Sequence, residues 1–513
     1  MAARPLDPRE VQVLEANAVA RGVSIDQLMD NAGHAVAAEA SRHLPPPPAA
    51  VGIVCGLGNN GGDGLAAASV LASQGYQPRI WLIGEPGKLR TVAARRRWDL
   101  VSGLRYVKAG APTAADLRGL PLVIDAMLGT GGRGAPREPY HSAIEEIVSS
   151  GVPVLSVDLP TGLGSTSVLR ARWTVALEVL KEGMDGPACG EVTVSSIGMP
   201  PEAHLETGVG EMALFPVPSP GTRKSDSGRV VVVGGGPYAG APFLAGMGAL
   251  RAGADMVIVL VPGAVADIVQ GYSPQLIVRA VGLGAEFTEE DSTELAELTS
   301  KARPTAVLVG NGVGESPETL GGLEKFLQWA LPSYPCAVDA DGLRVLSHRG
   351  GRPFPGQSAT RLLLTPNLRE FAHLASPEAR ASEAPGEEDV RRTAARLRAT
   401  VLVKGAVDVV SDGEETKVNR THHPAMVVGG AGDVLAGVTT SLLARGLSPF
   451  QAGRLATYWT GRAAVEAFER VSYGLLPSDL LDQLGPALRR GLEELRRISD
   501  PGRPVSPSSS PHE

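Results

Sequence analysis

The sequence predicts an α/β protein with two domains. Short runs of aliphatic residues end in glycine-rich loops, and each loop precedes a segment with the apolar spacing of a helix. This alternation is typical of parallel sheets covered by helices. A chain of 513 residues is too long for one ordinary domain. The proline-rich segment 215–221 interrupts the alternation and predicts a boundary there.

Composition excludes several classes of function. Hydrophobic residues make up 43% of the chain and aromatic residues only 4%, so small aliphatic side chains must form the core. A net charge of −7 gives no support for nucleic-acid binding. Cys55, Cys189 and Cys336 are too far apart to indicate a disulfide framework or a zinc site. The chain shows neither a signal peptide nor an unbroken membrane span, so we expect a cytoplasmic protein that binds no membrane.

The first half opens with a helical pattern over residues 9–42, broken at 22–24, where Ser24 can cap the second helix. The strand 51–55 then runs into the string 56–64, Gly-Leu-Gly-Asn-Asn-Gly-Gly-Asp-Gly, and an alanine-rich helix follows. Strand, glycine loop and helix form the first unit of a doubly wound sheet. The loop lacks the glycine spacing of a dinucleotide fingerprint. Its amides and carboxylate suit polar ligand atoms or a hard cation better than pyrophosphate alone.

Two further strands end in acids, one at Asp125 and one at Asp158. The carboxyl ends of parallel strands meet at one edge of a sheet, so these acids can converge with Asn60, Asp63 and Thr161. A single strand-end aspartate often only caps the next helix. Several of them beside glycine loops at the same edge favour a ligand site.

The string 58–64, with segments 125–131 and 158–162, resembles the NAD(P)H-hydrate epimerase family over roughly residues 9–215. Segment 28–33 resembles that family's opening helix motif, and 173–181 its late strand and lysine. The resemblance implies a Rossmann-like domain that interconverts the R and S epimers of hydrated NADH and NADPH, called NADHX and NADPHX. It implies Asp158 as the catalytic acid/base and K⁺ held by Asn60, Asp125 and Thr161. The implied substrate contacts are Asn59, Asn60, Gly61, Gly62, Asp63, Gly129, Thr130, Gly131, Gly132, Arg133, Gly134, Ala135 and Asp158.

The second half continues the alternation. The strand 229–233 ends in the glycine string 234–242, whose spacing is wrong for a dinucleotide fingerprint, so we expect a substrate loop. Further strands are predicted at 306–309, 336–339, 362–364 and 401–403.

The stretch 427–437, Val-Val-Gly-Gly-Ala-Gly-Asp-Val-Leu-Ala-Gly, begins the last predicted α/β unit. Amides at a helix start favour an anion, and glycines let a ligand approach the backbone. A carboxylate repels phosphate, so Asp433 is better suited to act as a base on a substrate hydroxyl beside the anion. The alternative is a plain loop-to-helix turn that Asp433 caps.

This half resembles the ribokinase-like superfamily, and within it the ADP-dependent NAD(P)H-hydrate dehydratases, over roughly residues 222–495. The match rests on residues 228–229, 238–242, 339–341, 365–366, 404–405 and 429–437. The resemblance implies ADP as phosphoryl donor with Mg²⁺, and Asp433 as the catalytic group that activates the C6 hydroxyl. The implied nucleotide contacts are Lys404, Gly405, Ala406, Val407, Asp408 and Gly432, and the implied contacts to the hydrated nicotinamide are Ala241, Gly312, Asn367 and Asp433.

We therefore predict a Rossmann-like doubly wound domain at 1–215, a linker at 216–224, a ribokinase-like domain at 225–497 and a disordered tail at 498–513. The fused domains predict an enzyme that repairs NADHX and NADPHX, and the family resemblance implies a homo-oligomer. One alternative is a ribokinase-like kinase of a small molecule such as a vitamin precursor, which leaves the first half unexplained. A second is a nucleotide-binding protein with a degenerate dehydratase site, because Asn367 and His422 differ from the residues usual in that family.

Overall fold

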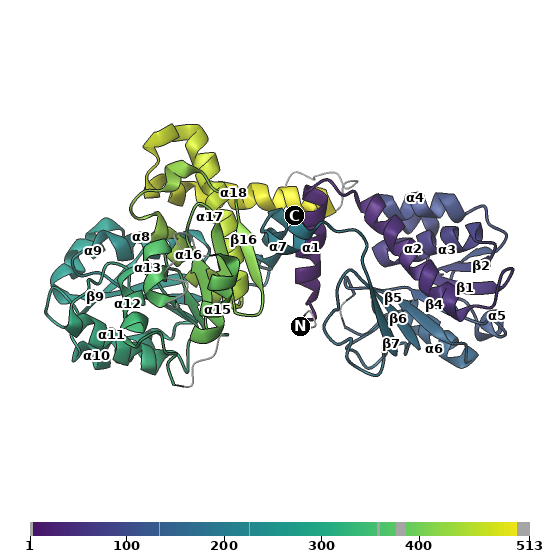
Figure 1. Ribbon diagram of the computed structural model, residues 1–513, viewed down its shortest axis with the longest axis horizontal. Helices are drawn as coiled ribbons and strands as arrows, with labels where there is room; N and C mark the ends of the chain where they lie inside the picture. The colour runs from purple at the N-terminus through teal and green to yellow at the C-terminus, as the bar shows by residue number, and fades with distance from the viewer. Residues whose placement is uncertain (1–3, 133, 225, 356–359, 376–385, 500–513) are drawn as a thin grey trace. The chain divides into compact units, whose positions relative to one another are not determined.

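The computed structural model describes residues 4–132, 134–224, 226–355, 360–375 and 386–499. The chain divides into two compact units, Met1–Ala203 with Glu494–Glu513, and His204–Glu493. Each unit has the predicted α/β architecture (Figure 1). The division lies before the proline-rich segment 215–221, because the residues just ahead of that segment pack into the second unit. Glu211, for example, is fully buried beside Lys417 and Arg454.

The first unit is built on a seven-stranded sheet in the order β3-β2-β1-β4-β5-β6-β7, with every neighbouring pair parallel. The winding reverses between β1 and β4, so the loops after these two strands lie side by side, as a doubly wound sheet requires. The strands are β1 (Ala50–Cys55), β2 (Gln77–Leu82), β3 (Val107–Ala109), β4 (Val123–Ala126), β5 (Val154–Val157), β6 (Trp173–Leu177) and β7 (Glu191–Ser195).

Helices cover both faces of this sheet. Along β1, Ile53 and Cys55 pack into the core beneath α2, α3 and α4, while Val54 packs into a separate core against α6. The predicted break in the first helical segment is confirmed, and Ser24 Oγ accepts from Gln27 N at 3.1 Å. The helices are α1 (Pro8–Ala20), α2 (Ile25–His43), α3 (Asn59–Ser73), α4 (Val92–Val101), α5 (Ala114–Leu117), α6 (Tyr140–Ser150) and, at the division, α7 (Pro201–Leu205).

The glycine-rich string after β1 forms a shorter loop than the sequence suggests. Helix α3 already begins at Asn59, so most of the string forms its first turns. A Cβ on Gly61 would lie 1.9 Å from Gly56 O, and one on Gly64 would lie 2.4 Å from Ala126 Cβ. These glycines let α3 pack directly against the ends of β1 and β4.

The second unit is built on a nine-stranded sheet in the order β10-β9-β8-β11-β12-β13-β14-β15-β16. Neighbouring strands are parallel as far as β14, and β15 and β16 are added antiparallel. The strands are β8 (Arg229–Val233), β9 (Met256–Pro262), β10 (Ile277–Val281), β11 (Ala306–Val309), β12 (Cys336–Val338), β13 (Leu362–Leu364), β14 (Thr400–Val403), β15 (Asp408–Ser411) and β16 (Thr416–Asn419).

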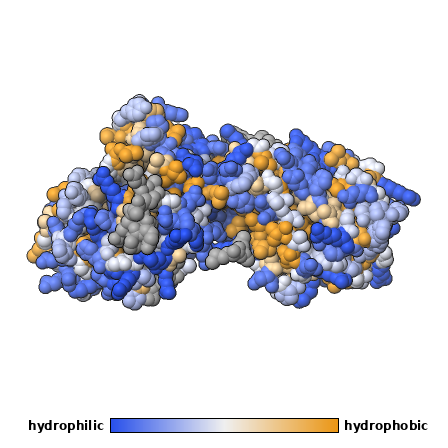
Figure 2. Space-filling model, in the orientation of Figure 1, coloured by the Kyte–Doolittle hydropathy of each residue, from blue (hydrophilic) through white to orange (hydrophobic). Residues whose placement is uncertain are grey.

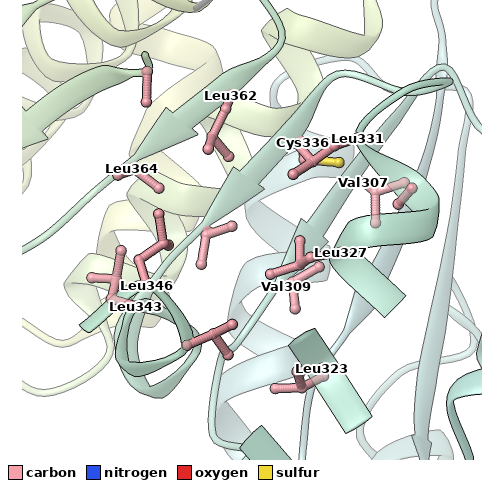
Figure 3. Packing of buried hydrophobic residues seen from close by; sticks show 14 of the residues in the cluster. Val307, Val309, Leu323, Leu327, Leu331, Cys336, Leu343, Leu346, Leu362 and Leu364 are labelled. Atoms are coloured by element: carbon pink, nitrogen blue, oxygen red, sulfur yellow. The ribbon is translucent and has the colours of Figure 1, made fainter. Parts of the chain in front are cut away.

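One face of this sheet carries an extensive buried core. Figure 3 shows Val307, Val309, Leu362 and Leu364 on the strands meeting Leu327 and other residues of the covering helices. The helices of the unit are α8 (Gly240–Arg251), α9 (Ala266–Tyr272), α10 (Asp291–Ala302), α11 (Pro317–Ala330), α12 (Leu343–His348), α13 (Leu368–Leu374), α15 (Glu387–Leu397), α16 (Ala431–Ala444), α17 (Pro449–Val471) and α18 (Pro477–Ser499), whose residues from Glu494 onward belong to the first unit.

Helix α16 packs closely against α8. A Cβ on Gly437 would lie 1.9 Å from Ala245 O, so any side chain there would force the helices apart. This contact fixes α16 against β8, β11 and β12. The predicted glycine turn and helix are thus confirmed, with Gly430 in the left-handed region (φ 97°) as the N-cap. At the other end of the chain, α18 continues to Ser499, so the first two residues of the predicted disordered tail are helical. Residues 500–513 lie outside the described part.

The described helices include none long and apolar enough to cross a membrane. On the face in view, hydrophilic residues predominate and hydrophobic ones form small groups (Figure 2). All three cysteines are buried and free.

Candidate active sites

The first site is a pocket of about 550 Å³ in the first unit. Helices α1 and α2 and the loops after β1, β4, β5 and β6 contribute to its wall. The sequence-predicted contacts that line it are Asn59, Asn60, Asp63, Gly129, Thr130, Gly131, Gly132 and Asp158. The glycine loops and the strand-end acid Asp158 therefore do meet in one cavity, while Asp125 and Thr161 are not among its lining residues.

Other predicted contacts of this site lie elsewhere. Gly61 and Gly62 are buried within α3, and a Cβ on Gly62 would lie 2.5 Å from Met29 Cε. Gly134 and Ala135 are exposed and are not among the lining residues. Arg133 lies outside the described residues. The substrate contacts of these residues stay predictions.

Asp158 follows β5 and holds an unusual backbone conformation, with φ 64°. A positive φ costs energy for a residue with a side chain, and such strain often marks functional sites. Its N–H donates to Val175 O at 2.8 Å, and its carboxylate forms an ion pair with Lys181. Lys181 is 2% exposed and also donates to Leu177 O. The pocket wall therefore carries the carboxylate of Asp158, which the ammonium group of Lys181 holds in place.

Two further carboxylates face this pair. Burial raises the pKa of Glu15, on α1, to about 7, and the negative charge of Asp158 raises it further while Lys181 opposes. Burial also raises the pKa of Asp63 well above its usual value, with Asp158 and Glu15 adding to the effect. Groups that exchange protons near neutral pH are suited to acid/base chemistry. Sequence reasoning missed Glu15, because nothing in α1 connects it with the glycine loops.

The predicted cation ligands lie beside this pocket. Asp125 Oδ1 accepts from Thr161 Oγ1 at 2.7 Å, and Asp125 Oδ2 accepts from Thr161 N at 2.9 Å. Both side chains are fully buried, and burial raises the pKa of Asp125 although its hydrogen bonds oppose the rise. The amide of Asn60 is buried and finds no hydrogen-bond partner among the described residues. A carboxylate, a hydroxyl and an unsatisfied amide oxygen form a donor set that fits a hard cation.

The second site lies where β11, β12, β13 and β14 end, opposite the start of α16. Asp339 is at its centre and is 1% exposed. Its Oδ1 accepts from Lys404 Nζ at 2.7 Å and from Thr365 Oγ1 at 2.7 Å. Its Oδ2 accepts from Asn311 Nδ2 at 3.0 Å. Residues at the ends of four neighbouring strands thus form one hydrogen-bonded network of side chains.

Asp433 joins this group from the first turn of α16. Its Oδ1 accepts from Asn311 Nδ2 at 2.7 Å. Burial raises the pKa of Asp433 to about 7, Asp339 raises it further, and Asn311 and Lys404 oppose the rise. The alternative that Asp433 caps the helix is wrong, because Gly430 is the N-cap and no side-chain cap is found among the described residues. Asp433 is therefore placed to exchange a proton near neutral pH.

The same helix start has the features of an anion site. Its first amides have no side-chain cap, and a Cβ on Gly432 would lie 3.2 Å from Lys404 Nζ. Burial disfavours the charge of Lys404, but the carboxylates of Asp339, Glu370 and Asp433 raise its pKa above the usual value. A helix N-terminus and a charged lysine together suit phosphate.

The remaining predicted residues surround these groups. Residues 405–407 form the turn between β14 and β15, and Gly405 N donates to Asp408 Oδ1 at 3.1 Å. A Cβ on Gly312 would lie 3.0 Å from Ala241 Cβ, so these two residues are adjacent as expected. The side chain of Asn367 caps α13, accepting from Arg369 N at 2.9 Å and Glu370 N at 3.0 Å. Its backbone pairs with that of Lys404.

Comparison with known proteins gives a separate family match for each of the two units. A family model described as NAD(P)H-hydrate dehydratase matches residues 230–486, and one described as YjeF-related protein N-terminus matches residues 25–183. A bifunctional NAD(P)H-hydrate repair enzyme of Hyperthermus butylicus is 37% identical over 95% of this chain and 93% of its own. One of Methanothermobacter thermautotrophicus is 34% identical over 95% of this chain and 96% of its own.

Solved structures resemble about half of this chain. A ribokinase-like superfamily protein of Enterococcus faecalis has 20% identity and a TM-score of 0.49, with 56% of this chain and 96% of that chain covered. An ADP/ATP-dependent NAD(P)H-hydrate dehydratase of Bacillus subtilis, co-crystallised with ATP and Mg²⁺, has 22% identity and a TM-score of 0.47. That match covers 55% of this chain and 96% of the other.

Proposed function

The chain belongs to the family of bifunctional NAD(P)H-hydrate repair enzymes, and we propose that its two sites divide the repair of NADHX and NADPHX between them. The pocket of the first unit serves the epimerase reaction. The site at the start of α16 serves the dehydratase reaction. A ribokinase-like kinase is not favoured, because it leaves the match over residues 25–183 without a role.

The observation that carries the dehydratase assignment is the position of Asp433. It is a carboxylate whose pKa burial raises to about 7, in the first turn of a helix whose uncapped amides and neighbouring lysine suit phosphate. A base beside an anion site is the arrangement needed to activate a hydroxyl for phosphoryl transfer.

In the proposed reaction, Asp433 takes the proton of the C6 hydroxyl. The hydroxyl oxygen then bonds to the terminal phosphorus of ADP, and the bond from that phosphorus to the bridging oxygen breaks, which releases AMP. Phosphate next leaves C6 with the bonding electrons while the adjacent ring carbon loses a proton. The new double bond restores NADH or NADPH. The amides of Gly429, Gly430 and Gly432 and the ammonium group of Lys404 hold the phosphates, whereas Ala431 N already donates to Val428 O. Mg²⁺ bound with the nucleotide would offset the negative charge of the phosphates.

In the epimerase pocket, Asp158 is the proposed acid/base beside the carbon that carries the hydroxyl. Lys181 holds its carboxylate in place. We propose that Asn60, Asp125 and Thr161 bind K⁺, since a cation would balance the buried charge of Asp125 and satisfy the Asn60 amide. The bound ion would supply a fixed positive charge near the pocket.

We further propose that the enzyme acts in the cytoplasm, where reducing conditions suit three free cysteines. A homo-oligomeric state stays a prediction of the family resemblance.

The proposal is tested with the purified S epimer of NADHX and either ADP or ATP, by following NADH absorbance. NADH and AMP should form in equal amounts from ADP. Binding of nucleotide without any NADH would favour a degenerate site. A phosphorylated product that accumulates without NADH would favour a kinase.

A further inference from the structure

Asn311 lies between two carboxylates in the dehydratase site. It follows β11, is 0% exposed, and its Nδ2 lies 2.7 Å from Asp433 Oδ1 and 3.0 Å from Asp339 Oδ2. Carboxylate oxygens accept hydrogen bonds, so only the amide nitrogen of Asn311 can face them. The two hydrogens of that nitrogen can satisfy one carboxylate each.

The result is a continuous chain of side chains from Asp433 through Asn311 to Asp339 and Lys404. Without a donor between them, the two acids would face each other as like charges in a buried setting, which disfavours ionisation of both. The charged groups that act on Asp433 are Asp339 and Asp341, which favour its protonated form, and Lys404, which favours the ionised form. Asn311 is the neutral group that works with Lys404 against the two acids.

We propose that Asn311 is a positioning residue of the dehydratase reaction. By donating to both carboxylates, it holds Asp433 in the orientation needed to reach the substrate hydroxyl and favours its ionised state. The inference rests on the proposed role of Asp433 as the base. It concerns the orientation and ionisation of that base, since Asn311 moves no proton of the substrate.

The structure also indicates which substitution removes the two hydrogen bonds donated by Asn311 without disturbing another contact of its side chain. Asn311 Oδ1 is buried and has no donor partner within the described part of the chain. Replacement by leucine, which has nearly the same shape, therefore removes the two donated hydrogen bonds and leaves no partner of Oδ1 behind. Replacement by aspartate also keeps the shape, but it adds a third carboxylate between the other two.

The experiment measures kcat/KM for the S epimer of NADHX against pH in the wild type, Asn311→Leu and Asn311→Asp. Both variants should lose about 10- to 100-fold at neutral pH, as expected when a hydrogen bond to a charged group is removed. The rise of activity with pH should move to higher pH in both, because Asp433 then holds its proton more tightly. The displacement should be larger for Asn311→Asp, whose added charge repels the base.

Two controls separate positioning from a general loss of structure. Epimerase activity, measured on the same preparations, should stay within about twofold of the wild type, because its site belongs to the other unit. Ser441 is a buried residue of α16, eight residues after Asp433. Ser441→Ala should leave the pH profile of dehydration unchanged.

Equal wild-type and variant pH profiles, in protein that melts at the wild-type temperature, would overturn the inference while leaving the proposed function intact. A loss of activity without any displacement of the profile would also overturn it, since a purely structural role predicts that result. An absence of NADH formation by the wild type would count against the proposed function itself and would overturn both.

Discussion

Lys404 donates from Nζ to Asp339 Oδ1 across 2.7 Å, and the same ammonium group lies against Gly432 at the start of α16. One lysine thus joins the strand-end carboxylates to the amides that suit phosphate. Asp339 accepts from Thr365 and Asn311 as well, so three donors share this buried carboxylate.

Lys404→Met should weaken ADP binding by about 10- to 100-fold, because it removes a charge-assisted hydrogen bond to phosphate. Titration calorimetry with ADP measures the change. Asp433→Asn is the matched comparison, since it removes a negative charge beside the phosphates and should bind ADP at least as tightly as the wild type. An unchanged dissociation constant in Lys404→Met would remove this lysine from the nucleotide site.

Dehydratase activity should rise with pH through about pH 7. Burial raises the pKa of Asp433 from 3.8 to about 7, and the base must be deprotonated to accept a proton. The acid limb of kcat/KM for the S epimer reports this ionisation in the free enzyme. A profile that stays flat from about pH 5.5 to 8.5 would show that another group is the base.

The ionisation of Asp433 should also make the stability of the folded protein depend on pH. The native pKa of Asp433 lies above the value expected in the unfolded chain, so the native state binds the proton more tightly. Its contribution to stability is therefore present below about pH 4 and is lost as the pH rises toward about 7. Asp433→Asn lacks this loss, so its melting temperature relative to the wild type should increase between pH 4 and pH 8. A constant difference across that range would argue against the raised pKa.

Parts of the two candidate active sites could be predicted from the sequence, because both are built at the edge of a parallel sheet. Strand-end positions are readable from hydrophobic runs, and strand ends meet at one edge, which is why the sequence predicts Asp125 and Asp158. Asp433 is predicted differently, from the glycine-rich start of a helix. The extent of α3 was not predicted, because glycines disfavour helices and only the close packing of α3 on β1 and β4 explains them. Glu15 was missed for lack of any local pattern. Asn311 follows a predicted strand, yet the role proposed for it depends on its distances to two acids remote in sequence.

Lys181→Met should lower epimerase turnover by about 100-fold or more, because it removes the cation that holds the Asp158 carboxylate at the pocket wall. Interconversion of the R and S epimers, followed by chromatography, measures this. Dehydration of the S epimer should be unaffected. Lys88→Met, which removes an exposed lysine paired with Glu85, is the surface control and should change neither activity. Full epimerase activity in Lys181→Met would contradict the role of the pair.

Glu211→Ala should destabilise the second unit by about 3–5 kcal/mol, because it removes a fully buried carboxylate that forms ion pairs with Lys417 and Arg454. Denaturant unfolding followed together with dehydratase activity measures the loss. Glu85→Ala breaks an exposed ion pair and should cost at most about 1 kcal/mol. Similar stability of the two variants would show that residues 204–214 do not depend on this cluster.

The division of labour between the two sites is tested most directly with Asp158→Asn and Asp433→Asn, each given mixed NADHX epimers, ADP and K⁺. Wild type should convert both epimers fully to NADH. Asp158→Asn should stop once the S epimer is consumed and leave the R epimer behind, apart from slow spontaneous interconversion. Asp433→Asn should form almost no NADH but still equilibrate the epimers. Loss of both activities in either variant, in folded protein, would contradict the assignment of one reaction to each unit.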